Sequence, residues 1–238
     1  MALPPDPAES FLREVDENLR RDQVRDAARK YANVAIGAAL LFLLAVGAYL
    51  FWQDRQRKAA EADTEQLSAA LSDIGEGKDA AATAKLDALT KSSAEGVSAS
   101  ARLANAVLAL QKGDRKSASA IYAALAADKG LAQPYRDLAL VRGTALDFDG
   151  LKPDEVIVRL QPLAVPGNAF FGSAGEMTGM ALLAKGQKNA AAQLFAKIAA
   201  DKTVPESLRS RAVQVAGSLG VDASASLPSA GLLPATAQ

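Results

Sequence analysis

Cysteine and histidine are both absent from this chain of 238 residues. The lack of cysteine excludes thiol chemistry and disulfide bridges, and the lack of histidine removes the side chain that most often moves protons near neutral pH. Common zinc sites and most catalytic triads and dyads are excluded with them. The stability of the protein therefore does not depend on disulfide bridges. The absence of cysteine does not identify the redox compartment in which the protein resides.

Aromatic residues make up only 5% of the chain, although half of its residues are apolar. The apolar content comes largely from alanine and leucine, which favour helices. Runs of β-branched residues alternating at a period of two are missing, so extensive sheet is not expected. The composition predicts an all-α protein.

Charge of one sign is not in excess, because 27 Lys and Arg residues balance 27 Asp and Glu residues. Nucleic-acid-binding proteins usually carry a concentrated basic face, and the sequence contains no such run. We therefore expect no nucleic-acid partner.

The feature that is most plainly present is an apolar run from Val34 to Trp52, nineteen residues without a charge. As a helix it measures about 28 Å, close to the ~30 Å hydrocarbon core of a bilayer. Tyr31 precedes the run, and Tyr49 and Phe51 lie near its far end, where aromatic rings favour the headgroup boundary. The run predicts a transmembrane helix over residues 34–52.

The run also has two other interpretations, a buried core helix and a cleaved signal peptide. A buried core helix seldom runs so long without a polar position. A cleaved signal peptide has small residues for cleavage at Val46-Gly47-Ala48, but the preceding segment is long and rich in acids, unlike a short basic n-region. An uncleaved span in the lipid bilayer is the better interpretation.

The Lys and Arg residues that flank the span predict its orientation. Five precede it and three follow it: Arg20, Arg21, Arg25, Arg29 and Lys30, then Arg55, Arg57 and Lys58. This bias favours a cytoplasmic N-terminus and places the large C-terminal domain across the membrane, in the periplasm of a Gram-negative source.

The segment before the span reads as an amphipathic helix. Prolines keep the first residues extended, Ser10 can cap a helix, and Leu12, Val15 and Leu19 then share one face. It is either a solvated helix leading into the membrane or a short docking helix for a protein partner.

An internal repeat follows the span. Glycines recur 36, 37 and 36 residues apart, at Gly77, Gly113, Gly150 and Gly186. Residues 110–129, LQKGDRKSASAIYAALAADK, align at an offset of 73 with residues 183–202, LAKGQKNAAAQLFAKIAADK. After each glycine, an alanine follows at five residues and a leucine or aromatic at nine, except in the third unit. This spacing predicts helical pairs, in which the glycine ends the first helix and the alanine allows close approach.

These offsets resemble the tetratricopeptide repeat over roughly residues 60–218. The resemblance implies an α-solenoid of helical hairpins, although a proline that commonly closes each unit is replaced by Gly130 and Thr203. A generic helical bundle is the alternative, since alanine-rich text aligns easily with itself. No proline or glycine separates the span from the first repeat, so we expect one continuous helix there.

The third unit is degenerate. Glu155 stands where the alanine is expected, a proline falls inside the second helix, and a Gly/Ser/Phe loop is predicted after it. Gly75-Glu76-Gly77 and Gly172-Ser173-Ala174-Gly175 both read as plain turns or loops.

No constellation of residues predicts catalysis. GxGxxG after a strand and GxxxxGK followed by Ser or Thr are missing. Asp147, Asp149 and Asp154 lack the spacing of a calcium loop and fit a polar turn better. We expect no catalytic residue, no metal ligand and no cofactor, and the protein is not expected to be an enzyme.

Binding is the remaining function, because repeat solenoids present a concave surface formed by the first helix of each pair. Counting back from each glycine gives the inward positions Leu67, Leu71, Leu103, Val107, Leu140, Thr144, Glu176 and Met180. They either pack against neighbouring helices or form an apolar groove for unfolded client segments or a partner helix.

The whole chain resembles the tetratricopeptide-like ancillary subunit of the bacterial Sec translocon. The residues that carry the resemblance are SFLREVDENLRRDQ before the span, the basic ARKY leading into it, YLFWQDRQ at its exit, and the helical pairs that follow. The resemblance implies an inner-membrane protein that associates with the translocon and a periplasmic chaperone and assists emerging polypeptides.

Two other functions stay open: a scaffold for envelope assembly or cell division, and a cytoplasmic-facing adaptor if the orientation is reversed. The sequence divides into a cytoplasmic segment 1–33, the span 34–52, a repeat domain 53–221 and a tail 222–238. The last fifteen residues lack helical periodicity and contain two prolines, which is typical of a flexible tail.

Overall fold

A computed structural model describes residues 7–226, without the side chains of residues 7–19, 22–25, 27–28, 35 and 226. The structure is 79% helix, and its described residues contain no strand. The all-α prediction is therefore confirmed. The predicted apolar face of Leu12, Val15 and Leu19 and the last twelve residues of the predicted tail lie outside this description.

The chain divides into two compact units, Met1–Ala59 and Ala60–Gln238. One helix, α1 (Pro7–Gly75), begins in the first unit and ends in the second, which agrees with the expected continuity between span and repeat. It begins three residues before Ser10, where the sequence predicted the start. Proline suits a first helical position, because the N–H it lacks has no partner there in any helix.

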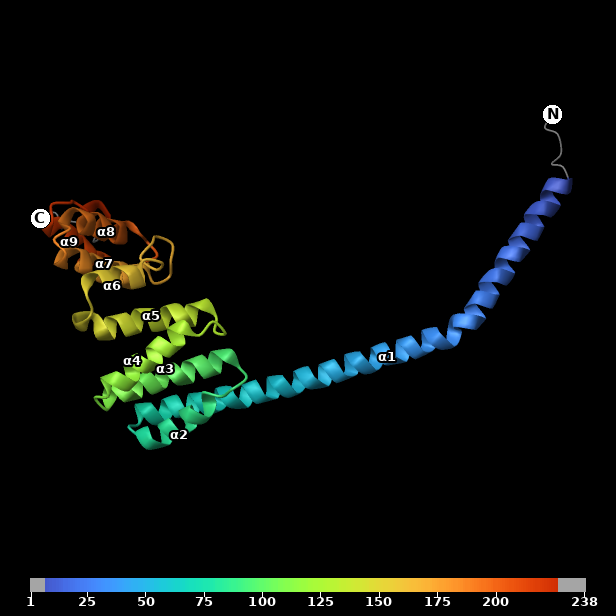
Figure 1. The fold of residues 1–238 in the computed structure, drawn as a ribbon, viewed down its shortest axis with the longest axis horizontal. Coiled ribbons are helices and arrows are strands. Elements are labelled where there is room, and N and C mark those ends of the chain that lie inside the picture. Colours follow the sequence, from blue (N-terminus) through green and yellow to red (C-terminus); the bar gives the residue numbers. More distant parts are fainter. Residues whose placement is uncertain (1–6, 227–238) are drawn as a thin grey trace, which may run out of the picture. The chain divides into compact units, whose positions relative to one another are not determined.

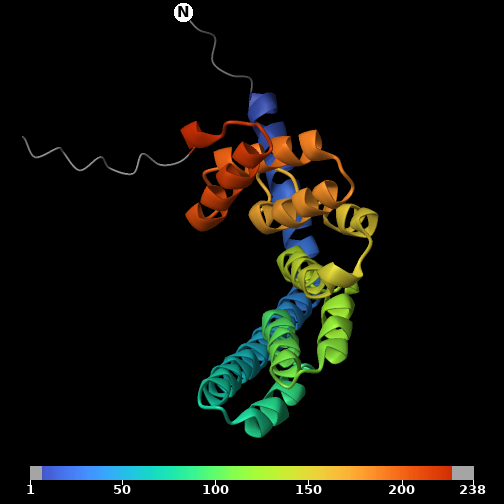
Figure 2. The same ribbon diagram turned by 90° about the vertical axis from the view of Figure 1, so that its left-hand side faces the viewer.

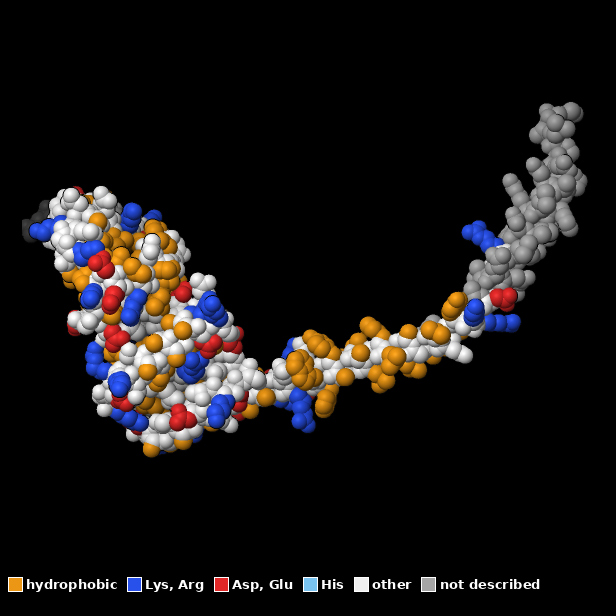
Figure 3. Space-filling view, viewed as in Figure 1, with side chains coloured by type: hydrophobic (Ala, Val, Ile, Leu, Met, Phe, Trp, Pro, Cys, Tyr) orange, Lys and Arg blue, Asp and Glu red, His pale blue; other side chains and the backbone are white. Residues whose placement is uncertain are grey.

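In the first unit, the apolar stretch of α1 is long and apolar enough to cross a membrane, and none of it is buried. Hydrophobic side chains cover this stretch in Figure 3. Cations lie against aromatic rings near both ends: Lys30 Nζ is 5.8 Å from the Tyr31 ring centre, and Arg55 Cζ is 5.6 Å from that of Phe51. This arrangement is typical of the two boundaries of a bilayer.

The second unit consists of helical hairpins that pack in chain order, followed by a single last helix (Figure 1). The end of α1 pairs with α2, and the remaining pairs are α3 with α4, α5 with α6, and α7 with α8. The helices are α2 (Asp79–Leu89), α3 (Glu95–Gln111), α4 (Arg115–Ala127), α5 (Gln133–Asp147), α6 (Pro153–Leu160), α7 (Phe171–Ala184), α8 (Lys188–Ala200) and α9 (Glu206–Ser218). Figure 2 shows this stacking from the green to the red helices.

Glycines with positive φ end three of the four first helices, as the spacing predicts. Gly77, Gly113 and Gly186 have φ of 74°, 77° and 76°, which a side chain rarely tolerates. The prediction is wrong for Gly150, which lies in the 3₁₀ turn η1 (Phe148–Gly150) and has no positive φ. Gly220, with φ 89°, ends α9 in the same way and was not singled out from the sequence.

Three positions at a constant spacing of four and then three residues are buried along each second helix, and in the third hairpin the last of them lies just after α6. The sets are Ala82, Leu86 and Leu89; Ala118, Tyr122 and Leu125; Val156, Leu160 and Leu163; and Ala191, Phe195 and Ile198. In the third hairpin the set lies one residue later than predicted, because α6 begins three residues after its glycine and the other second helices begin two residues after theirs. Glu155 is consequently exposed and does not occupy the small position.

Two predictions about the sequence around this hairpin are wrong. The proline at 162 is not inside a helix, because α6 already ends at Leu160. Gly172–Gly175 is not a loop but part of α7. A Cβ at Gly172 would lie 2.8 Å from Val204 Cγ1, and one at Gly175 would lie 2.9 Å from Ile198 Cδ1. These glycines therefore allow neighbouring segments to approach α7 closely.

Another small position lies seven residues before each repeat glycine. It is occupied by Ala70, Ala106, Gly143 and Gly179. The two alanines are fully buried, and a Cβ at Gly179 would lie 2.7 Å from Cε2 of Phe195. In the fourth hairpin the Phe195 ring therefore lies where a side chain at this position would be, whereas the second hairpin, with Tyr122, takes Ala106.

Candidate interaction surface

The predicted inward residues lie on the first helices of the hairpins, but they differ in exposure. Leu71, Val107 and Met180 are 50%, 44% and 46% exposed, whereas Thr144 is only 1% exposed. Leu67, Leu103 and Leu140 are partly buried. Each of these three leucines packs against a buried cluster of its own hairpin or the next one.

The three exposed residues share one repeat position, six residues before their glycine. Only five large apolar side chains are exposed among the described residues of the second unit: Leu71, Val107, Val158, Val165 and Met180. Single exposed apolar residues are common on proteins. Three of these five recur at one repeat position of the first helices, whereas Val158 and Val165 share no repeat position with them. We name Leu71, Val107 and Met180 the apolar repeat positions.

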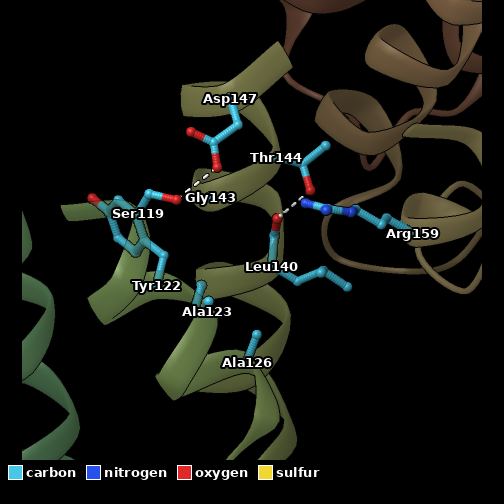
Figure 4. Close-up of a pocket in the computed structure, with 10 residues that line it drawn as sticks. Ser119, Tyr122, Ala123, Ala126, Leu140, Gly143, Thr144, Asp147 and Arg159 are labelled. Carbon is cyan, nitrogen blue, oxygen red and sulfur yellow. Dashed lines mark hydrogen bonds between the residues drawn. The ribbon is translucent and has the colours of Figure 1, made fainter. Parts of the chain in front are cut away.

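The third hairpin departs from this pattern. Thr144 occupies the equivalent position, and its hydroxyl donates a hydrogen bond of 2.7 Å to the carbonyl oxygen of Leu140. Beside it lies a cleft of ≈180 Å³ between α4, α5 and α6. Figure 4 shows Ser119 donating to the Asp147 carboxylate at its upper end, and Arg159 extending from α6 toward Thr144 and Leu140.

The fourth hairpin is covered by α9. Glu176, a predicted inward residue, accepts two hydrogen bonds from the guanidinium of Arg211 in α9, one of them 2.7 Å long, from Nη2 to Oε2. The hydrogen bond to Glu176 raises the pKa of Arg211. The position of α9 that corresponds to the apolar repeat positions is Gln214, which is exposed and polar. A polar last helix is the usual cap of a solenoid.

The repeated Ala-Ala-Asp-Lys segments end the second helices. The carboxylate of Asp128 accepts from Arg102 Nη1 at 2.9 Å and from the backbone N–H of Gly130 at 3.1 Å. Asp201 accepts from the backbone N–H and the hydroxyl of Thr203, at 2.9 and 2.6 Å. The side-chain hydrogen bonds from Arg102 and Thr203 hold the pKa values of Asp128 and Asp201 below their usual range. The repeated aspartate therefore orders the turn that leads to the next hairpin.

Two of the three aspartates around the third hairpin serve separate contacts. Asp147 accepts from Ser119, and Asp154 pairs with Lys185. Residues 20–226, as far as their side chains are described, contain no group of three acidic residues placed to hold a metal ion.

Comparison with known proteins identifies the family to which the repeat belongs. A family described as "Tetratricopeptide repeat-like domain" matches residues 28–216. No curated protein and no solved structure matches the chain. Domains of this kind typically bind protein partners and are typically non-enzymatic. The match covers most of the chain, from before the predicted span into α9. The chain is therefore a member of the tetratricopeptide repeat-like domain family.

Proposed function

We propose that this protein is a membrane-anchored helical-repeat protein that binds extended, unfolded polypeptide segments at its apolar repeat positions. In this proposal residues 34–52 span the bacterial inner membrane with the N-terminus in the cytoplasm. Residues 1–33 form the cytoplasmic segment, residues 53–221 form the repeat domain in the periplasm, and residues 222–238 form a tail. The observation that carries the proposal is the exposure of Leu71, Val107 and Met180 at one repeat position.

The size of this apolar contribution suits transient binding. Burying a Leu, Val or Met side chain completely stabilises a complex by about 1.5–3 kcal/mol. Half-exposed residues contribute less, and ordering an unfolded client opposes the gain. Contacts from three separate helices therefore add up to weak, reversible binding, as a protein that passes a client onward requires.

The proposed partners are the Sec translocon and a periplasmic chaperone. Their support is the resemblance of the segments before and after the span to the ancillary translocon subunit, together with the apolar anchor and the helical repeat. Such a location brings the apolar repeat positions to the side of the membrane where translocated polypeptides emerge.

Client binding is tested by replacing Leu71, Val107 and Met180 together with serine. The matched control replaces Val158 and Val165, which are exposed at 69% and 46% but lie outside the apolar repeat positions. Binding of a permanently unfolded, photo-crosslinkable polypeptide to the full-length protein in nanodiscs is measured. We expect about tenfold weaker binding for the triple variant and little change for the control. Equal binding by all three proteins would overturn the proposal.

The partners are tested by crosslinking and mass spectrometry in native membranes. Crosslinks from the repeat domain to translocon subunits or a periplasmic chaperone support the proposal. Crosslinks only to division or envelope-assembly proteins favour the scaffold function instead. Reporter fusions at the C-terminus test orientation, and activity of a cytosolic reporter alone would reverse the proposed topology.

A further inference from the structure

The cleft between α4, α5 and α6 is a second opening in the repeat domain, separate from the apolar repeat positions. Its apolar lining combines the small residues Ala123, Ala126 and Gly143 with the larger side chains of Tyr122 and Leu140. A Cβ on Gly143 would lie 3.1 Å from Cβ of Tyr122, so the glycine lets α4 and α5 approach at this point. The small residues on facing sides of α4 and α5 leave room between these larger side chains.

The same face of the fourth hairpin is closed. At the repeat offset of 73, Ser119 and Ala126 of α4 correspond to Ala192 and Ala199 of α8. Ala192 and Ala199 are buried, and Ala199 belongs to the cluster that packs on α9. On α4, by contrast, Ala123 is exposed and Ala126 only partly buried. The opening therefore lies between the second and third hairpins and not at the corresponding face of α8, and Arg159 of α6 lies beside it.

The volume of the cleft fits one amino-acid side chain. It measures ≈180 Å³, and an apolar cavity of about 150 Å³ holds a benzene molecule. A cleft of this size takes a single leucine- or phenylalanine-sized group and not a whole folded element. It is suited to anchor one residue of an extended segment.

The polar groups at the cleft leave one donor available. The Thr144 hydroxyl donates to Leu140, and Asp147 accepts from Ser119. Arg159 lines the cleft and takes part in no ion pair or hydrogen bond among the side chains that the structure describes. A guanidinium offers a planar fork of donors that matches a carboxylate in two parallel hydrogen bonds. A partly apolar cleft with such a donor on the side away from Asp147 suits an apolar residue that neighbours a carboxylate.

We propose that this cleft binds one large apolar side chain of a polypeptide segment while Arg159 pairs with a carboxylate next to it. The carboxylate is either the C-terminal group of the polypeptide or an adjacent Asp or Glu side chain. This inference rests on the proposed function, since it assigns a specific subsite to a protein that binds extended polypeptides.

Three fluorescent peptides test it by anisotropy with the full-length protein in nanodiscs. One ends in a free C-terminal leucine, one carries an internal Leu-Glu pair and an amidated end, and one has the leucine but no carboxylate. We expect at least one of the first two to bind at least tenfold more tightly than the third. The tighter of the two identifies the source of the carboxylate. Equal binding of all three, or no binding of any, overturns the proposal.

Two variants locate the binding. Arg159→Gln removes the charge, and we expect it to reduce the preference for a carboxylate about tenfold, whereas Lys152→Gln on the exposed residue before α6 leaves it unchanged. Ala123→Leu fills the cleft from an exposed position, and we expect it to abolish binding, whereas Ala127→Leu on the same helix does not. Unchanged binding by both Arg159→Gln and Ala123→Leu would overturn the proposal.

The serine variant of the apolar repeat positions separates this inference from the proposed function. Its peptide binding at the cleft stays intact if the two sites are independent. Loss of unfolded-client binding in Ala123→Leu alone would assign client capture to the cleft and not to the apolar repeat positions. Circular dichroism and thermal unfolding of each variant establish that a loss of binding is not a loss of fold.

Discussion

The third hairpin, α5 with α6, and the fourth, α7 with α8, bury equivalent residues of their second helices. They differ in how closely other helices pack against their first helices. In the fourth, three glycines of α7 allow α8 and the turn after it to approach, and α9 covers the far side. In the third, Gly143 of α5 faces back toward Tyr122 of α4, and α6 is short. The same spacing therefore gives a sealed hairpin or an open one, depending on residue size at a few positions.

The largest expected loss of stability comes from truncating the large buried side chain in the middle of a second helix. Phe195→Ala removes a ring seated on Gly179 and is expected to cost about 3–5 kcal/mol of unfolding free energy. Leu160→Ala, at the corresponding position of the third hairpin, should cost less, because a smaller side chain leaves a smaller cavity. Urea unfolding of the full-length protein in detergent measures both. A larger loss for Leu160→Ala would break the comparison.

The one-residue shift of the third hairpin is tested by two neighbouring substitutions. Val156 is 1% exposed, so Val156→Ala should lose most of the stabilisation of a buried valine, about 1.5–3 kcal/mol. Glu155→Ala changes an exposed residue and should stay within about 0.5 kcal/mol. The same unfolding measurement applies, and the reverse order would restore the register predicted from the glycine spacing.

The close contact between Phe195 and Gly179 is tested by replacing Gly179 with alanine and, in parallel, Gly143 with alanine. Both substitutions gain the same helix propensity, about 1 kcal/mol, so their difference reports steric strain. Gly179→Ala brings a methyl group to 2.7 Å from the Phe195 ring, whereas Gly143→Ala brings one to 3.1 Å from Tyr122 Cβ. We expect Gly179→Ala to be less stable by about 1 kcal/mol or more. Equal stabilities would show that both sites adapt equally well.

The smallest effect concerns acid sensitivity of the turns that follow the two hairpins. Asp201 orders the turn after α8, whereas Asn168, which does not titrate, accepts from the Phe170 N–H after α6. Hydrogen bonds from Thr203 hold the pKa of Asp201 below its ordinary value. The stabilisation is therefore complete above the unfolded pKa of about 3.9 and is lost as the pH falls through the lower folded pKa.

Hydrogen exchange between pH 5 and 2.5, corrected for intrinsic rates, measures this difference. We expect acid to increase opening of residues 201–205 more than that of residues 165–170. Asp201→Asn should remove the difference between the two turns. A pH response of Asp201→Asn equal to that of the unmodified protein would show that another group titrates there.

A feature of the fold is predictable from sequence when the interactions that cause it lie within a few neighbouring residues. A helix long and apolar enough to cross a membrane follows from the uninterrupted apolar run, and three of the repeat glycines follow from the φ angle that a turn demands. The register of α6 does not, because one extra residue in the turn leaves no signature in the glycine spacing. The same holds for α7, whose glycines suggest a loop until the side chains of Val204, Ile198 and Phe195 are in place.

The candidate site shows the same division. The sequence named Leu71, Val107 and Met180 together with residues that turned out to be packed, because helical spacing gives a side chain's direction and not what lies opposite it. Arg159 could not be chosen from sequence, since it comes from the second helix of its pair and its role depends on where α6 begins. A search for unequal residue sizes between aligned repeats would have drawn attention to this hairpin.

By itself, the sequence determined an all-helical chain with one apolar segment long enough to cross a membrane, a repeat of about 36 residues, and the small and large residues that recur within it. These properties depend on composition, periodicity and backbone preference, which act over one or two helical turns. Only the tertiary structure decided which of the repeated positions are exposed, which face α9 seals, and where the cleft opens. Those outcomes depend on contacts between helices that are distant in the sequence, and a change of one residue in a turn or one methyl group in an interface is enough to alter them.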